Sequence, residues 1–305
     1  MPIKKTITIV EAPSNLGLMP PAPGKTPGVN YAPAALKTAQ LANRLRAQDG
    51  GGIEAPIYNP QIEPEIGIRN AAAIRGYSTR LAEAVGRVVK TDRFALVLGG
   101  DCSILLGTAL ALRKLGRYGL VFIDGHTDFH TPQTTRSGGV AGMDLALATG
   151  NGPELLTNIG GLKPYIRETD TVLLGNRDIA DPRTYPAKHI FGSQVQMIPL
   201  DSLRALGIDS VIQQTLQKFE ISAVSGFFIH LDVDVIDSTV MPAVDSPMPG
   251  GLSYIELGRI LRGLLASDLV VGMEITIYDP DRDPDGSAAR DFVSALVHIF
   301  GAVYE

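Results

Sequence analysis

Residues 122–130 most constrain the fold, because they place three potential metal ligands, Asp124, His126 and Asp128, at alternate positions. The preceding run, residues 119–123, has no polar alternation, which is typical of a strand covered on both faces of a parallel sheet. Successive side chains of a strand point to opposite faces, so we expect the three ligands on one side. In open α/β sheets, ligands bind beyond the carboxyl ends of the strands. The segment therefore predicts a metal site at that edge of a parallel sheet.

A second motif repeats this pattern, with Asp232 and Asp234 following the apolar run 223–229. If the two strand ends lie side by side, four carboxylates share one pocket, and they cannot all stay ionised there without cations. Two divalent ions would balance that charge. A single D-x-H-x-D motif could instead consist of loop acids or helix caps, but a second motif at the end of another apolar strand favours the metal site.

Cys102 belongs to the sequence Gly-Gly-Asp-Cys-Ser, which lies between a predicted strand at residues 94–98 and a predicted helix at 104–115. The two glycines allow close approach of the backbone at this turn. A cysteine near a helix amino terminus favours the thiolate, so we predict that Cys102 is a metal ligand. The alternative is a small buried hydrophobic residue, which is the more common environment of cysteine.

Strand and helix patterns alternate along the chain, without a linker or internal repeat that would divide it. We therefore predict a three-layer α/β/α fold with a mostly parallel central sheet, as a single domain over residues 1–305. Further strands are predicted at residues 6–10, 53–58, 171–175, 195–200 and 269–277, and further helices at 34–48, 71–91 and 201–219.

Composition narrows the range of partners. The net charge of −5 argues against a nucleic-acid partner or an anionic membrane surface, and it favours a small-molecule substrate. The single cysteine rules out an intrachain disulfide and is compatible with a reducing compartment. The first residues lack the apolar core of a signal peptide, and no apolar run approaches about 18 residues. We expect a cytoplasmic protein.

These motifs together resemble the ureohydrolases, the group of arginase, agmatinase and formiminoglutamase. The similarity rests on residues 99–103, on Asp124-Gly125-His126-Thr127-Asp128 and on Asp232-Val233-Asp234, followed by Pro242, Ser246-Pro247 and residues 250–253. The resemblance implies the arginase fold, two divalent ions that are manganese in this family, and a metal-bridging hydroxide that attacks a guanidinium or amidine carbon. It also implies a homo-oligomer, either a trimer or a hexamer.

The resemblance also implies roles for individual residues. Asp124 and Asp232 would bridge both ions, His126 and Asp234 would complete one of them, and Cys102 with Asp128 would complete the other. We further predict catalytic roles for Asp128 and His130 and substrate-binding roles for Ser137, Asp181 and Ser246.

The chain departs from the family pattern at four positions. Most of the family has histidine at the position of Cys102, so one ion would gain a softer ligand. The proton-shuttle histidine of the family falls at Ala141, and the carboxylate that usually receives the guanidinium falls at Ile277. Glu274 cannot replace that carboxylate if the strand is regular, because three residues along a strand reverse the face. The asparagine that often follows the metal motif becomes His130.

From these features we predict a dinuclear metal-dependent hydrolase that cleaves a C–N bond of a guanidino or amidino compound. The alternative is a metal-binding pseudoenzyme that acts as a binding or assembly partner. His130 continues the alternate-position row and would replace the missing proton shuttle. Alternatively, His130 turns to solvent or bonds a backbone carbonyl.

The first testable prediction concerns metal content. Protein purified with manganese should contain about two ions per chain, because a dinuclear site of this kind binds a pair of cations. Elemental analysis measures the content, and Asp232→Ala should reduce it because that variant removes a bridging carboxylate. Fewer than one ion per chain, with the same content in Asp232→Ala, would contradict the metal site.

Overall fold

The computed structural model describes residues 5–180 and 187–304. Its central element is an eight-stranded sheet in the order β2-β1-β5-β10-β9-β6-β7-β8, and every strand pair in it is parallel. This arrangement confirms the predicted three-layer α/β/α fold. The strands are β1 (Ile7–Ala12), β2 (Gln48–Gly52), β5 (Phe94–Gly99), β6 (Gly119–Ile123), β7 (Thr171–Leu174), β8 (Gln196–Ile198), β9 (Phe227–Asp232) and β10 (Val270–Thr276), and a separate hairpin pairs β3 (Ile62–Glu63) with β4 (Ile68–Arg69).

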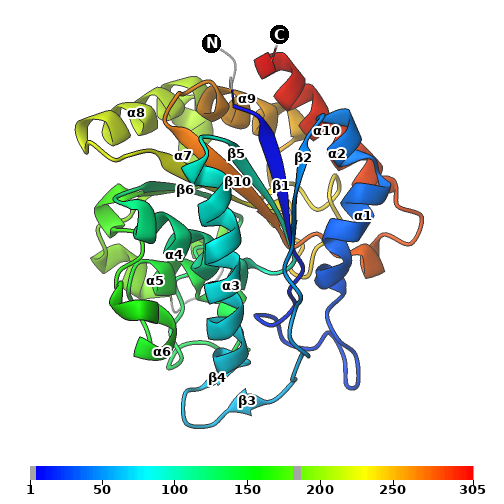
Figure 1. Cartoon of the computed structure of the whole chain (residues 1–305), viewed down its shortest axis with the longest axis vertical. Coiled ribbons are helices and arrows are strands. Elements are labelled where there is room, and N and C mark those ends of the chain that lie inside the picture. Colours follow the sequence, from blue (N-terminus) through cyan, green and yellow to red (C-terminus); the bar gives the residue numbers. More distant parts are fainter. Residues whose placement is uncertain (1–4, 181–186, 305) are drawn as a thin grey trace.

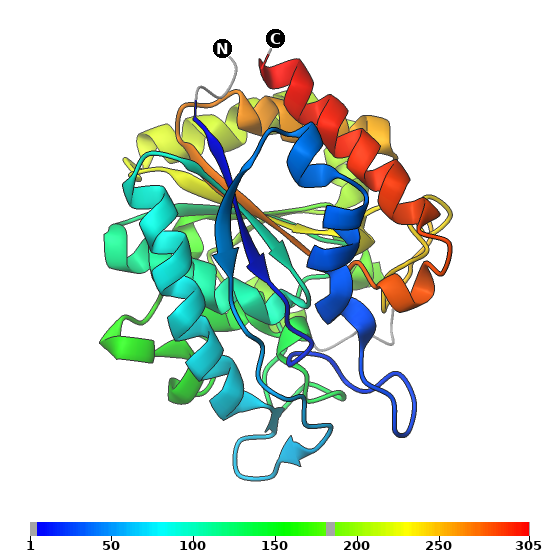
Figure 2. The ribbon, with the colours of Figure 1, turned by 45° about the vertical axis from the view of Figure 1, so that its right-hand side comes forward.

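Helices cover both faces of the sheet (Figures 1 and 2). One face packs against α3 (Ala71–Lys90), α4 (Leu105–Leu115), α5 (Asp144–Ala148) and α6 (Glu154–Thr157), and the other against α1 (Ala32–Thr38), α2 (Leu41–Arg44), α7 (Leu200–Leu206), α8 (Ile208–Ile221), α9 (Tyr254–Leu265) and α10 (Ser287–Tyr304). The strands β5, β6 and β9 are buried along their whole length because both of their faces are covered. This burial explains the apolar sequences of β5 and β6 and of residues 227–229 in β9.

Two predicted helices are wrong because each is broken by a residue in a left-handed conformation. The predicted helix at 34–48 is α1 followed by α2, with Gln40 at φ +68° between them. The predicted helix at 201–219 is α7 followed by α8, with Gly207 at φ +84° between them. Apolar residues keep helical spacing across both breaks, so periodicity alone could not detect them.

The predicted edge strand at residues 53–58 is also wrong. The edge strand is β2, which contains Gly50-Gly51-Gly52 and pairs with β1. A Cβ at position 50 would lie 2.6 Å from the carbonyl oxygen of Ile9, so only glycine allows this close approach. The sequence does not predict a strand here, because glycine is usually depleted in strands.

The strand order explains why the two acidic motifs meet. The strands β6 and β9 are neighbours, and Ile123 pairs with Leu231, so Asp124 and Asp232 lie at the same edge. The strands β5 and β10 continue the sheet beside β9 and end at that edge as well. Four consecutive strand ends therefore surround one site.

No helix within residues 5–180 or 187–304 is long and apolar enough to cross a membrane.

Candidate metal centre

A cavity of about 390 Å³ opens at the carboxyl ends of these four strands. Its lining includes the predicted residues Cys102, His126, Asp128, His130, Ser137, Asp232, Asp234 and Ser246. Asp124 lies beneath the lining and is fully buried. Asp181 lies outside the described residues. The structure thus brings the six proposed metal ligands together, and their binding of metal remains a prediction.

The first ligand group consists of Asp124, His126 and Asp234, which offer ligand atoms within 4.8 Å of one another. His126 Nδ1 lies 2.9 Å from Asp234 Oδ2 and 3.6 Å from Asp124 Oδ1. The backbone N–H of His126 donates to Asp124 Oδ1 at 2.6 Å, which fixes that carboxylate. Three donors of two chemical types therefore already surround one position suited to a hard divalent cation.

The alternating strand geometry that we predicted for this motif is wrong. The strand β6 ends at Ile123, and Asp124–His130 forms a loop in which Asp128 has φ +42°. The ligands converge because the loop is held by hydrogen bonds, such as those from the N–H and hydroxyl of Thr127 to Asp178 Oδ2 at 2.9 and 2.8 Å. Asp124, His126 and Asp128 therefore lie together because of this loop conformation, and strand alternation does not explain their grouping.

Cys102 lies directly after β5, in a turn with very little free space. A Cβ at position 100 would lie 1.8 Å from the carbonyl oxygen of Ser14, so this position requires glycine. Asp101 caps the turn by accepting from the N–H of Ser103 at 2.8 Å, and Ser14 Oγ donates to the other oxygen of Asp101 at 2.7 Å. These contacts hold the thiol in the site, where it lies 2.9 Å from Asp232 Oδ2.

The electrostatics of Cys102 differ from our expectation. Burial, followed by the charge of Asp232, raises the pKa of the Cys102 thiol well above its usual value. Cys102 begins a three-residue 3-10 turn that continues directly into α4, so it lies near a helix amino terminus as predicted, but burial outweighs the effect of that dipole. A cation is therefore required to generate the thiolate here.

The buried carboxylates also have displaced pKa values. Burial and the neighbouring Asp234 raise the pKa of Asp124 to about 6. Burial, together with Asp124, raises the pKa of Asp128 well above its usual range. Burial acts on Asp234 in the same direction, but His126 lowers the pKa of that carboxyl below its usual value. Burial and mutual repulsion therefore disfavour the ionised form of most carboxyl groups in this pocket.

Two buried carboxylate oxygens without hydrogen-bond partners also indicate that the site fits cations. Asp124 Oδ2 and Asp144 Oδ2 are buried and have no hydrogen-bond partner among the residues that the structure describes. Leaving a buried acceptor unpaired costs about 1–3 kcal/mol. Divalent cations in these positions would satisfy both the charge and the lone pairs, so the residues fit a pair of bound metals.

Asp144 was missed by the sequence reasoning. It is the first residue of α5, it is fully buried, and it offers a ligand atom within 4.8 Å of ligand atoms of Cys102 and Asp128. Burial, then Asp124, raises its pKa well above the usual range. Its sequence signal is a lone acid within the otherwise apolar stretch 139–148.

His230 and Glu274 form a second missed feature beneath the site. Their side chains are fully buried, with His230 Nδ1 2.6 Å from Glu274 Oε1. Glu274 does not line the cavity, in agreement with our prediction that it cannot replace the missing substrate carboxylate. The strand ends at Thr276, however, and Ile277 follows with φ +72°, so Ile277 reaches the cavity from an irregular backbone position.

On the substrate side, the cavity lining contains both retained polar groups and apolar replacements. Ser246 Oγ lies 3.4 Å from His126 Nε2, and Ser137 lies across the cavity. Ala141 and Ile277 also line it, at the positions where the resemblance implies a histidine and a carboxylate. His130 lines the cavity as well, and burial lowers the pKa of its ring below the usual value.

Comparisons with known proteins agree with the fold and identify a family. The sequence model described as "Arginase family" matches residues 6–301. An arginase of Bacillus subtilis is 30% identical over 303 residues, covering 97% of this chain and 98% of that protein. The solved arginase of Bacillus caldovelox superimposes with a TM-score of 0.85 at 30% identity, covering 97% of this chain and 98% of that one. The formimidoylglutamase of Bacillus subtilis shares the fold, with a TM-score of 0.73 at 20% identity, over 97% of this chain and 86% of that one.

The second prediction concerns Asp144. In metal-free protein at neutral pH, Asp144→Asn should raise the free energy of unfolding by about 1–2 kcal/mol, because it removes a buried ionisable group that lies beside other carboxyls. Urea denaturation measures this change. The control is Glu83→Gln on the exposed face of α3, which should change stability by less than about 0.5 kcal/mol. A less stable Asp144→Asn protein would contradict the prediction.

Proposed function

This chain belongs to the arginase family of ureohydrolases, and from that premise we propose that it is a dinuclear metal-dependent hydrolase of a C–N bond in a guanidino or amidino compound. The observation that carries this proposal is the convergence of Cys102, Asp124, His126, Asp128, Asp232 and Asp234 at one cavity. When bound, two divalent cations would supply Lewis-acid activation of the attacking water near neutral pH. The nitrogen and oxygen donors of His126, Asp124 and Asp234 suit manganese at their position.

The substrate is proposed to differ from arginine and agmatine. A guanidinium gains about 1.5–3 kcal/mol from a buried charged partner, and the position that supplies this partner in the family is occupied by buried Ile277. The same cavity still contains Ser137 and Ser246, which can bond a polar substrate. We infer a guanidino or amidino compound whose recognition does not depend on a carboxylate at position 277.

We also propose a cytoplasmic homo-oligomer, a trimer or hexamer by family resemblance. Exposed apolar side chains at Leu206, Ile221 and Ile255, on the neighbouring helices α7, α8 and α9, support contact between copies.

The third prediction is the outcome of a substrate screen. Urea or ammonia release is measured across guanidino acids, guanidino amines, hydroxyguanidines and free guanidine. Arginine and agmatine should be about 10- to 150-fold poorer in kcat/KM than the best compound, which corresponds to the missing charged partner.

Ile277→Glu is the matched variant for this screen. Residue 277 already has a left-handed φ, so glutamate adds no new backbone strain, and the variant should gain activity toward arginine. Arginine as the best substrate of the native protein would contradict the proposed specificity. Metal-loaded protein that is inactive on every compound, yet is thermally stabilised by one of them, would instead indicate a binding protein.

His130 is the residue we propose for proton transfer. Its backbone N–H donates to the carbonyl of Gly142 at 3.2 Å, so it lies beside Ala141, where the family's histidine would be. Its Nδ1 is buried without a hydrogen-bond partner in the described part of the chain. The lowered pKa keeps the ring neutral at pH 7, so it can first accept a proton from the attacking water and then pass it to the leaving amine.

The fourth prediction tests this role. His130→Asn, which introduces the family's usual residue, should lower kcat by about 100-fold on the best substrate because the proton carrier is lost. Metal content, measured by elemental analysis, should stay at the native level. The double variant His130→Asn/Ala141→His should recover activity, because it returns an imidazole to the same cavity. Native turnover in His130→Asn would eliminate His130 as the proton carrier.

A further inference from the structure

The buried pair of His230 and Glu274 has a fixed geometry with one ring nitrogen unused. His230 in β9 is the register partner of Glu274 in β10, and their side chains meet at 2.6 Å through His230 Nδ1. The ring also stacks on Phe122, with centroids 4.4 Å apart and an angle of 5° between the planes. His230 Nε2 is buried and has no hydrogen-bond partner among the residues described. The imidazole is thus held in one orientation by an acid and an aromatic ring.

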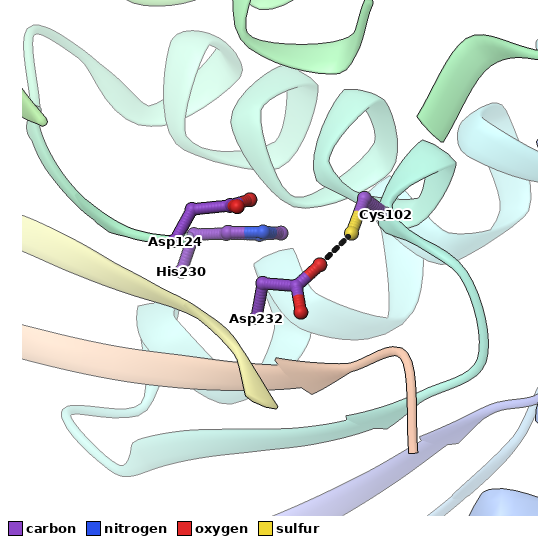
Figure 3. Close-up of side chains that lie close together, drawn as sticks. All are labelled: Cys102, Asp124, His230 and Asp232. Atoms are coloured by element: carbon purple, nitrogen blue, oxygen red, sulfur yellow. Dashed lines mark hydrogen bonds between the residues drawn. The ribbon is translucent and has the colours of Figure 1, made fainter. Parts of the chain in front are cut away.

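This ring lies close to the Cys102 thiol. Figure 3 shows the side chains of His230 and Asp124 lying together and extending toward Cys102 and Asp232. One ligand atom from each of these four residues lies within 4.8 Å of the others. Four donors around one tetrahedral ion are about 3.3–3.8 Å apart, so a small contraction would close the set around a cation.

The hydrogen bond to Glu274 matches the environment of a metal-binding histidine. Such a histidine almost always donates its second ring N–H to a carboxylate or carbonyl, which fixes the tautomer and raises the basicity of the other nitrogen. Here Nδ1 faces the carboxylate, so Nε2 is the nitrogen whose lone pair is left for a ligand. A purely structural pair would not need Nε2 and Asp124 Oδ2 to remain buried and unpaired.

We propose that His230, oriented by Glu274, is a ligand of the ion bound by Cys102, Asp124 and Asp232, and that this ion is a thiophilic divalent cation of the zinc type. A thiolate and an imidazole with two carboxylates form a donor set that favours Zn²⁺ over Mn²⁺. The histidine missing at position 102 is thereby replaced by an imidazole from the neighbouring strand β9. This inference rests on the proposed dinuclear centre, but it does not depend on which substrate is cleaved.

The test uses Zn²⁺ and Co²⁺ alone, on full-length metal-free protein, without substrate. His230→Phe keeps the ring stacked on Phe122 but removes the nitrogen, and it should weaken zinc binding in chelator competition by at least about 100-fold, more than the loss of a group that only orients a ligand. Glu274→Gln should weaken zinc binding by about 10-fold. The control His298→Ala changes an exposed histidine on α10 and should leave zinc affinity unchanged.

His230→Phe leaves Glu274 buried without a partner, which could destabilise the protein. The double variant His230→Phe/Glu274→Leu replaces both polar groups with apolar ones and therefore controls for that loss of stability. It should keep the thermal stability of the metal-free protein and still lose zinc affinity. Unchanged zinc affinity in either variant would overturn the proposal and assign the pair a structural role only.

Spectroscopy identifies the ligands directly. With one equivalent of Co²⁺, the native protein should show a thiolate-to-cobalt charge-transfer band in the near ultraviolet, which Cys102→Ser should abolish. X-ray absorption of protein with one equivalent of Zn²⁺ should show one sulfur and one imidazole, and His230→Phe should lose the imidazole contribution. Zinc bound without sulfur would also overturn the proposal. A failed substrate screen would leave all these measurements valid.

Discussion

The dominant constraint on this protein is the concentration of negative charge in a dry pocket. Five aspartates, Asp124, Asp128, Asp144, Asp232 and Asp234, lie at one edge of a sheet whose strands are buried on both faces. The pKa of Asp124, Asp128, Asp144 and Asp232 is raised because water cannot solvate their charge there. Burying several carboxylates without a counterion is unfavourable in free energy, so this arrangement indicates a site that binds cations.

The rest of the fold positions those charges. The strand order places β9 beside β6 and β10 beside β5, so side chains distant in sequence meet at one edge. Short backbone contacts then fix individual groups: Gly100 lets the turn before Cys102 pass against Ser14, and Asp178 holds the loop after Asp124 through Thr127. The precision of the site therefore comes from loops attached to a rigid sheet, as is usual in α/β enzymes.

The departures from the arginase pattern change the polarity of the cavity and the set of potential metal ligands. On the substrate side, Ala141 and Ile277 remove polar groups from the cavity, and His130 introduces a neutral imidazole. On the metal side, Cys102 is shared by two groups of potential ligands, one with Asp128 and Asp144 and the other with Asp124, His230 and Asp232. The cavity has thus fewer polar groups at the positions proposed to meet the substrate, and more potential ligands around the Cys102 thiol.

The sequence by itself determined the sheet-based fold, the grouping of the two acidic motifs and the participation of Cys102 in the same cavity, because apolar strands and their terminal acids are local patterns. It failed for the breaks at Gln40 and Gly207 and for the glycine-rich strand β2, where backbone conformation and close packing override periodicity. Only the tertiary structure revealed Asp144, His230 and Glu274 as parts of the site. A lone acid in an apolar helix, and a histidine and a glutamate in two different strands, gain meaning only when the sheet places them within hydrogen-bonding or ligand distance of one another.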